Sequence, residues 1–194
     1  MRFFSKTETE QDLIEGCKKG KASAQRKIYE QYSKKMFGIC LRYIGNAFEA
    51  EDVLVMSFTR VFEHIHSYKN EGSFEGWIRR IVVNEALGLL RKKGRVSFDE
   101  IEVADYQGHF EVQTDDLQAA ELMQLIKKLP DGYRTVFSMY AIEGYSHQEI
   151  ADKLGITEST SKSQLNRARA QLKQAIESLQ GEHYTYSKTA KTNP

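Results

Sequence analysis

The stretch SHQEIADKLGITESTSKSQLNRARAQL (Ser146–Leu172) predicts two short helices that are separated by a glycine. Ser146 and Glu149 have the spacing of a capping box, which satisfies free backbone N–H groups at the start of a helix. Gly155 is the residue type that most readily ends a helix in a left-handed conformation, and Thr157 can cap the helix that follows. The pattern indicates a helix-turn-helix.

At about 100° per residue, the second of these helices divides into two faces. The face expected to be buried carries Ser161, Leu165, Ala168 and Leu172. The opposite face carries cations and short hydrogen-bonding groups, namely Ser159, Lys162, Ser163, Asn166, Arg169 and Lys173. Lysine and arginine can bind phosphates, and Arg, Asn and Ser can read base edges in a major groove. An αα-hairpin whose polar face only meets water is the alternative, but the capping box, the glycine and the basic face together favour DNA binding.

The composition is that of a globular protein, with 194 residues, 40% hydrophobic residues and 28% charged residues. Only two prolines interrupt a chain rich in helix-forming residues, which favours long helices. No run reaches the roughly 18 apolar residues of a membrane helix, and the N-terminus lacks an apolar signal core. We therefore expect a cytoplasmic protein. Cys17 and Cys40 lack the spacing of metal ligands and are expected to be reduced, buried thiols.

Charge is distributed unevenly along the chain, although the formal net charge is only +1. The segment 76–95 contains six basic residues but only one acidic residue, Glu85, whereas the segment 96–121 contains acidic residues and no Lys or Arg. The sequence therefore predicts an all-α protein of two domains joined by an acidic flexible linker. The predicted parts are a helical domain at 9–95, the linker at 96–114, a second helical domain at 115–180 and a polar, frayed tail at 181–194.

Apolar periodicity predicts four helices in the first domain and two before the helix-turn-helix in the second. The first four are expected at 9–20, 23–45, 47–68 and 74–95, and the other two at 115–129, capped by Thr114, and 131–144. The expected core positions are Leu13, Ile14, Cys17, Ile28, Tyr32, Met36, Ile39, Tyr43, Val53, Phe58, Val61, Phe62, Ile65, Phe74, Trp77, Ile78, Ile81, Val82, Leu89, Ile150, Ala151, Leu154 and Ile156.

Two parts of the sequence resemble one protein family. The segment LPDGYRTVFSMYAIEGYSHQEIADKLGITESTSKSQLNRARAQLK (129–173) resembles the sigma4 domain of extracytoplasmic-function (ECF) sigma factors, in the sigma-70 family. The segments AEDVLVMSFTRVF (50–62) and FEGWIRRIVVNEALGLLRKK (74–93) resemble the sigma2 domain. The two matches occur in the family order and cover about 12–176 apart from the linker. Both predicted domains of the chain thus resemble those of an ECF sigma factor.

The resemblance implies a protein that binds bacterial RNA polymerase core, directs it to specific promoters and promotes DNA opening. It assigns recognition of the −35 element to Thr160, Lys162, Ser163, Asn166, Arg167 and Arg169. It assigns recognition and melting of the −10 element to Lys69, Asn70, Arg80, Asn84, Arg91 and Lys92, with the loop 69–73 capturing a flipped base. Tyr68 and Phe74 are further candidates for the base pocket, but Phe74 and Trp77 are more readily explained as core residues.

The resemblance also implies protein partners. The third helix would bind the clamp of the largest polymerase subunit through Glu51, Asp52, Val55, Met56, Thr59 and Arg60, while a second contact involves the flap of the second-largest subunit. Val55 and Met56 replace a Gln-Glu pair that is common in the family, and Ser161 stands where the family usually has Val. The usual family partner is an anti-sigma factor, either membrane-bound or soluble. From its charge alone, the acidic linker is predicted to pass near the template-strand channel.

The sequence does not predict an enzyme. It contains no phosphate-binding glycine loop, nucleophile elbow or HExxH motif. His64 and His66 are two residues apart, so on a helix they face different directions. We expect no catalytic residue, no metal site and no cofactor. Two other hypotheses are a stand-alone operator-binding regulator, which the sigma2-like segment disfavours, and an interaction module that binds a regulator in place of DNA.

Overall fold

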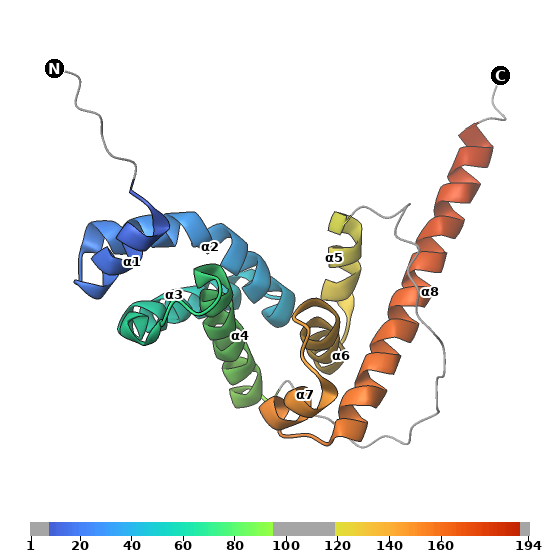
Figure 1. Cartoon of the computed structure of the whole chain (residues 1–194). Helices are drawn as coiled ribbons and strands as arrows, with labels where there is room; N and C mark the ends of the chain where they lie inside the picture. The colour runs from blue at the N-terminus through green and yellow to red at the C-terminus, as the bar shows by residue number, and fades with distance from the viewer. Residues whose placement is uncertain (1–7, 95–118, 191–194) are drawn as a thin grey trace. The chain divides into compact units, whose positions relative to one another are not determined.

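The computed structural model describes residues 8–94 and 119–190, and every regular element within these ranges is helical. The fold is therefore all-α, as the sequence predicts (Figure 1). The chain divides into two compact units between Leu90 and Arg91. The predicted linker at 96–114 lies outside the described residues, and so does Thr114 as the expected cap of the helix that follows. No helix in the described ranges combines the length and the apolar character needed to cross a membrane.

The first unit contains α1 (Glu10–Lys18), α2 (Ala22–Ile44), α3 (Ala47–Glu63), the 3₁₀ turn η1 (Ile65–Ser67) and α4 (Phe74–Lys92). The last two residues of α4, Arg91 and Lys92, lie beyond the boundary of this unit. Short-range signals in the sequence set most of these ends. Thr9 and Asp12 form a capping box at the start of α1. Gly45 ends α2 with φ 75°, and the Asn46 side chain then accepts a hydrogen bond from the Glu49 N–H at 3.1 Å.

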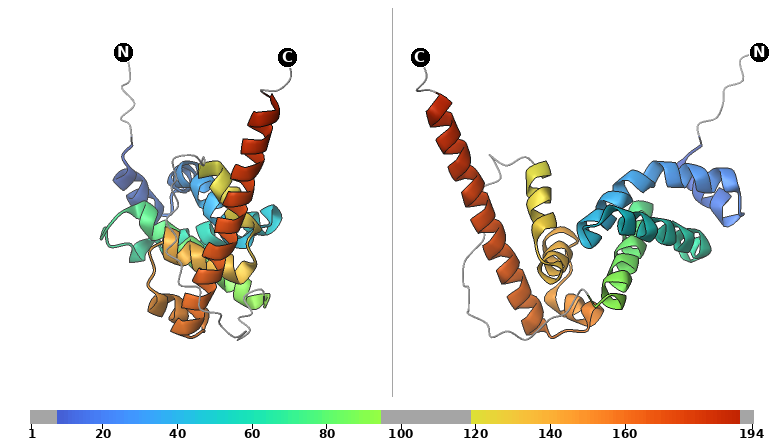
Figure 2. Two further views of the ribbon diagram at one scale, coloured as in Figure 1. Left: turned by 90° about the vertical axis from the view of Figure 1, so that its right-hand side faces the viewer. Right: turned by 180° about the vertical axis from the view of Figure 1, so that it is seen from behind.

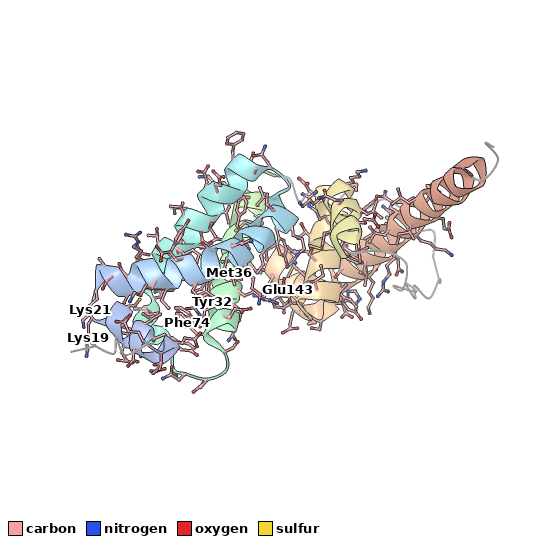
Figure 3. The ribbon with its side chains drawn as sticks, turned by 90° about the horizontal axis from the view of Figure 1, so that it is seen from above. Lys19, Lys21, Tyr32, Met36, Phe74 and Glu143 are labelled. Atoms are coloured by element: carbon pink, nitrogen blue, oxygen red, sulfur yellow. The ribbon has the colours of Figure 1, made fainter. Side chains whose placement is uncertain are left out.

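The core of the first unit forms between α2 and the helices that pack on it. Figures 1 and 2 show α3 running along α2 and α1 lying against it. The predicted apolar stripe of α2 is confirmed, because all five of its residues are buried: Ile28, Tyr32, Met36, Ile39 and Tyr43. The rings of Tyr32 and of Phe74 in α4 pack edge to face with 5.9 Å between their centroids, and both residues are labelled in Figure 3. Burial also raises the pKa of the Cys40 thiol to about 12, as expected for an unreactive core cysteine.

Two expectations for this unit are wrong in detail. The third helix ends at Glu63 rather than Tyr68, and the chain continues as the 3₁₀ turn η1. In α4 the buried stripe comprises Phe74, Ile78, Val82, Val83, Ala86, Leu87 and Leu90. Trp77, Ile81 and Leu89 were expected in the core but are only half-buried, because they lie on the flanks of this stripe. Phe62 of α3 is also half-buried.

The second unit contains α5 (Ala119–Lys128), α6 (Asp131–Phe137), the π-helical turn η2 (Ser138–Ile142), α7 (His147–Leu154) and α8 (Glu158–Ala190). Helices α5, α6 and α7 each pack against α8. Helix α5 ends shortly before Pro130, as predicted. Helix α8 does not fray at Gly181 but continues to Ala190, because one interior glycine costs only about 1 kcal/mol and no proline follows before Pro194.

Candidate nucleic-acid interface

The predicted helix-turn-helix is present in the second unit. The Ser146 N–H donates to the Glu149 carboxylate at 2.8 Å, and the Glu149 N–H donates to the Ser146 hydroxyl at 3.2 Å, which completes the capping box. Gly155 adopts φ 70° and donates its N–H to the Ala151 carbonyl at 2.9 Å. Thr157 then accepts a hydrogen bond from the Thr160 N–H at 3.0 Å. Local sequence therefore sets both helix ends and the turn between them.

The buried face of α8 is the predicted one. Ser161, Leu165, Ala168 and Leu172 are all buried, and they pack beneath α7 and α6. Ile156, which was expected to enter the core, is only half-buried. The polar face of α8 therefore points away from the core of its own unit.

The six residues predicted for −35 recognition share the first turns of α8, but their environments differ. Lys162 is exposed and forms an ion pair with Glu158 at 2.7 Å, which lowers the pKa of that carboxylate. The other five, Thr160, Ser163, Asn166, Arg167 and Arg169, are half-buried. The Ser163 hydroxyl donates to the Thr160 carbonyl at 2.9 Å, so it must exchange this hydrogen bond to contact a base.

A cluster of side chains that sequence reasoning did not anticipate lies beside this helix. His147, the first residue of α7, shares a hydrogen bond of 2.9 Å between its Nδ1 and the buried Ser161 hydroxyl. The His147 ring stacks on Tyr140 of η2 with 4.5 Å between ring centroids. The guanidinium of Arg169 lies over the Tyr140 ring at 5.7 Å. Burial lowers the pKa of His147, and the positive charge of Lys162 lowers it further.

A second candidate site is a surface pocket of about 450 Å³ in the first unit. It is lined by η1, the loop that follows it and one side of α4, through Ser67, Tyr68, Lys69, Glu71, Trp77, Arg80, Ile81 and Asn84. The centroids of the Tyr68 and Trp77 rings lie 5.5 Å apart. Beside this aromatic surface the pocket has two cations, one carboxylate and one amide. This combination suits an unstacked base beside its phosphates.

The loop 69–73 has a defined local conformation. The Tyr68 hydroxyl donates to the Gly72 carbonyl at 2.9 Å and closes the loop. Asn70 has φ 60° and Gly72 has φ 80°, so two left-handed residues turn the chain back toward α4. The Ser73 hydroxyl accepts from the Gly76 N–H at 3.0 Å and caps α4.

The structure brings together only part of the residue set predicted for the −10 element. Lys69, Arg80 and Asn84 line the pocket, whereas Asn70 sits in the loop without lining it. Arg91 and Lys92 are exposed at the end of α4. Phe74 is only 1% exposed, so it belongs to the core, as the sequence favoured. Trp77 is the reverse case, because it lines the pocket instead of joining the core. Its stacking on Phe74, with 5.7 Å between ring centroids, anchors the ring.

All six residues predicted for polymerase binding are exposed on α3: Glu51, Asp52, Val55, Met56, Thr59 and Arg60. The Arg60 guanidinium pairs with Glu85 of α4 at 2.6 Å, and the Thr59 hydroxyl donates to the Val55 carbonyl at 3.0 Å. Val55 and Met56 are unusual for exposed residues, since 58% and 51% of their surfaces are accessible.

Phe48, in the first turn of α3, is 81% exposed and was missed in the sequence analysis. Its position seven and eight residues before Val55 and Met56 could have revealed it, because this spacing places the three side chains on one helix face. An apolar surface of this kind marks a protein-binding face more often than a solvated one. We call Phe48, Val55 and Met56 the α3 apolar patch.

Comparison with known proteins places both units in one family. The model for sigma-70 region 2 matches residues 28–96, and the model for sigma-70 region 4 matches residues 119–172. The chain is 31% identical over 179 residues to the ECF RNA polymerase sigma factor SigW of Bacillus subtilis, covering 86% of this chain and 96% of SigW. It is 30% identical over 153 residues to the ECF RNA polymerase sigma factor SigE of Mycolicibacterium smegmatis, covering 75% of this chain and 59% of SigE.

Among solved structures, the chain is similar to the Bartonella quintana sigma factor RpoE, which was crystallised with the anti-sigma factor NepR. The identity is 19%, the TM-score is 0.49, and the match covers 78% of this chain and 96% of RpoE. The two family models and the SigW match decide the assignment. The chain belongs to the ECF RNA polymerase sigma factors of the sigma-70 family.

Proposed function

We propose that this sigma factor binds RNA polymerase core, directs it to promoters with particular −10 and −35 sequences, and promotes DNA opening. One observation carries the proposal: a single chain combines a helix-turn-helix with a separate pocket that is suited to an unstacked base. The first feature fits duplex DNA and the second fits a melted strand. Neither feature requires a chemical reaction, so the proposed mechanism is one of positioning.

In the second unit, we propose that the polar face of α8 enters the major groove at the −35 element. Lys162, Asn166 and Arg167 have the side-chain types that donate to or pair with base edges, and Ser163 is short enough to approach them. Thr160 and Arg169 would contact the DNA backbone. The Lys162–Glu158 ion pair is exposed and therefore weak, so a phosphate can replace the carboxylate at little cost.

In the first unit, we propose that the pocket holds a base flipped from the −10 element. Removing a base from the stack costs a few kcal/mol, and stacking on an aromatic ring recovers about 1–3 kcal/mol. The half-buried Trp77 ring can supply that stacking, supported by the buried Tyr68 ring beside it, while Asn84 can form hydrogen bonds with the base edge. Lys69 and Arg80 lie where they can bind the adjacent phosphates, and Arg91 and Lys92 extend the basic track along α4.

For polymerase binding, we propose the exposed face of α3. The α3 apolar patch would supply the buried centre of the interface, and Glu51 and Asp52 its polar rim. This arrangement offsets the absence of the Gln-Glu pair at Val55 and Met56. Arg60 also has a structural role, because it joins α3 to α4 through Glu85. The clamp of the largest subunit as the partner, and the flap of the second-largest subunit as the partner of the second unit, rest on the family resemblance.

An anti-sigma factor that masks the polymerase- and DNA-binding faces of both domains remains a prediction of the family resemblance, and a cytoplasmic location remains a prediction from the sequence. The acidic linker is expected to act near the template-strand channel. Replacing its Asp and Glu residues with Asn and Gln should change the yield of abortive products, and unchanged initiation would contradict that role.

The proposal is tested by run-off transcription with purified core polymerase and a library of randomised promoters. Promoter-dependent transcripts are expected, and their sequences would reveal the −10 and −35 elements together. Heat-denatured chain serves as the control for transcription by the core alone. DNA binding without transcripts would instead favour an operator-binding regulator, and polymerase binding without promoter selection would favour an interaction module.

A further inference from the structure

Side-chain contacts in the cluster beside α8 connect three elements of the second unit. Tyr140 comes from the π-helical turn η2, His147 from the start of α7, and Ser161 and Arg169 from α8. The contacts run in series: Arg169 on the Tyr140 ring, that ring on His147, and His147 on Ser161. Two positions on α8 that are eight residues apart are thus connected through one stack of rings.

These two positions bracket the DNA-facing part of α8. Ser161 is fully buried, and the next residue in the sequence, Lys162, is exposed. Arg169 is half-buried, and its contact with Tyr140 limits where its guanidinium can reach. Tyr140 itself remains 36% exposed, so the stack borders solvent on its outer side.

We propose that Tyr140 and His147 are positioning residues for promoter recognition: they hold α8 at Ser161 and direct the side chain of Arg169 to the DNA backbone, so that the base-reading side chains of α8 keep their register on the −35 element. This inference rests on the proposed function of α8 in −35 binding. Neither residue touches DNA in the proposal. Each acts through a residue of α8, because a correctly aimed side chain loses less freedom on binding than a mobile one.

The ionisation of His147 gives this arrangement a signature that a purely structural contact lacks. The groups that face the ring are Tyr140 on η2 and Glu158, Lys162 and Arg169 on α8. Burial and the two cations lower the pKa of His147 and so favour its neutral form, while Glu158 opposes them. Protonation also makes Nδ1 a donor only, so Ser161 can then only accept.

Bound DNA should raise the pKa of His147. Phosphates that contact Lys162 and Arg169 neutralise the cations that disfavour the imidazolium, so the pKa of His147 is higher in the complex than in the free protein. Binding is therefore accompanied by proton uptake, and affinity rises as the pH falls through the interval between the two pKa values. The rise cannot exceed about tenfold per pH unit, because a single group is titrated.

Four variants separate position from charge. His147→Asn keeps a hydrogen-bonding atom near the place of Nδ1 but does not titrate, whereas His147→Ala removes the contact. Tyr140→Phe keeps the ring stack, and Tyr140→Ala removes it. His64→Asn is the matched control, because His64 is an exposed histidine in the first unit.

The experiment measures binding of polymerase holoenzyme to the promoter duplex selected from the randomised library, and to the same duplex with a scrambled −35 element. Each variant is assayed at several pH values from 7.5 down to about 5.5, with circular dichroism to verify folding. In each alanine variant, the ratio of the affinities for the intact and the scrambled duplex is expected to fall about fivefold, which is the effect of losing one hydrogen bond or ring contact. Tyr140→Phe should retain the preference at pH 7.5. His147→Asn keeps the hydrogen bond to Ser161 but not the ring stack, so it should retain more of the preference than His147→Ala, and it should lose the acid-dependent gain that His64→Asn keeps.

The outcomes that overturn the inference are distinct from those that overturn the proposed function. If the wild-type holoenzyme does not discriminate between the two duplexes, α8 does not read a −35 element and both proposals fail. If it discriminates, and both alanine variants do so equally well, the positioning role alone is refuted. Should the alanine variants unfold, the pH profile decides, because a wild-type profile in His147→Asn excludes His147 from the linkage.

Discussion

At His147, burial and the neighbouring cations Lys162 and Arg169 act in the same direction. Both disfavour the imidazolium, so the pKa of His147 is below the ordinary value of 6.5. In the unfolded chain neither influence operates, and the side chain titrates at its usual pH. Below that pH the unfolded state binds more protons than the folded state, which makes folding of the second unit sensitive to acid.

We therefore predict that the free protein loses stability as the pH falls through about 6.5 and toward the lower pKa of folded His147. The stabilising contribution is complete above this interval. His147→Asn should unfold with a weaker dependence on pH, measured as the urea midpoint by circular dichroism at pH 7.5 and pH 5.5. An equal loss of stability in wild type and variant would show that other groups cause the acid sensitivity.

The α3 apolar patch can also be tested by changing one residue. Met56 is 51% exposed, so about half of its surface is accessible to a partner. We predict that Met56→Glu weakens binding to core polymerase by at least about tenfold, because an unpaired carboxylate would be buried in the interface. Its unfolding midpoint should stay close to that of wild type.

Ser23→Glu is the control for this variant, because it adds the same charge at an exposed position in the first turn of α2. Binding is measured by titrating labelled chain with core polymerase. Equal affinities for the two variants would place the polymerase contact elsewhere.

At the scale of elements, the connection from α5 to α6 depends on one buried cation. Arg134 is 4% exposed, and its guanidinium donates to the carbonyls of Leu129 at 2.9 Å and Lys127 at 3.3 Å. It also pairs with the Asp131 carboxylate. One side chain of α6 thus satisfies carbonyls at the C-terminal end of α5 where Pro130 prevents the helix from continuing.

Arg134→Ala should destabilise the second unit by about 3 kcal/mol, because it leaves buried carbonyls and a carboxylate without their donor. Circular dichroism should show this loss, while the fluorescence of Trp77, the single tryptophan of the chain, reports an unaffected first unit. Arg26→Ala is the control, since the Arg26–Glu30 pair is exposed and should contribute less than about 1 kcal/mol. A cost near that of the control would mean that water replaces the guanidinium.

At the scale of the whole molecule, the two candidate DNA-binding sites belong to different units. The pocket residue Asn84 lies in the first unit, and Arg167 of α8 lies in the second. Contributions from independent sites add in free energy, whereas residues that share contacts usually do not.

We predict that Asn84→Ala and Arg167→Ala weaken promoter binding by holoenzyme independently, each by about 1–3 kcal/mol. Asn84→Ala should relax the preference at the −10 element, and Arg167→Ala should relax it at the −35 element. The double variant should show the product of the two fold-changes, measured on promoters substituted in either element. A markedly smaller combined effect would mean that the two sites do not act separately.

The sequence by itself determined the helical class, the presence of two helical units and most helix ends. One family model matches each of the two predicted domains. Capping boxes, left-handed glycines and apolar periodicity are interactions within a few residues, so they can be recognised without knowing the fold. The ends of the two helices in the helix-turn-helix and the turn between them followed from such signals, because the hydrogen bonds that set them span only three to five residues.

Only the tertiary structure decided which side chains meet across elements. Trp77 was expected in the core but lines a pocket, because the flank of α4 is left uncovered where the loop 69–73 turns back. The contact between His147 and Ser161 joins residues fourteen positions apart, and its formation depends on how α7 crosses α8. Periodicity identifies the face of a helix that is buried, but the packing of one helix on another determines the limits of that face and the partners of its polar groups.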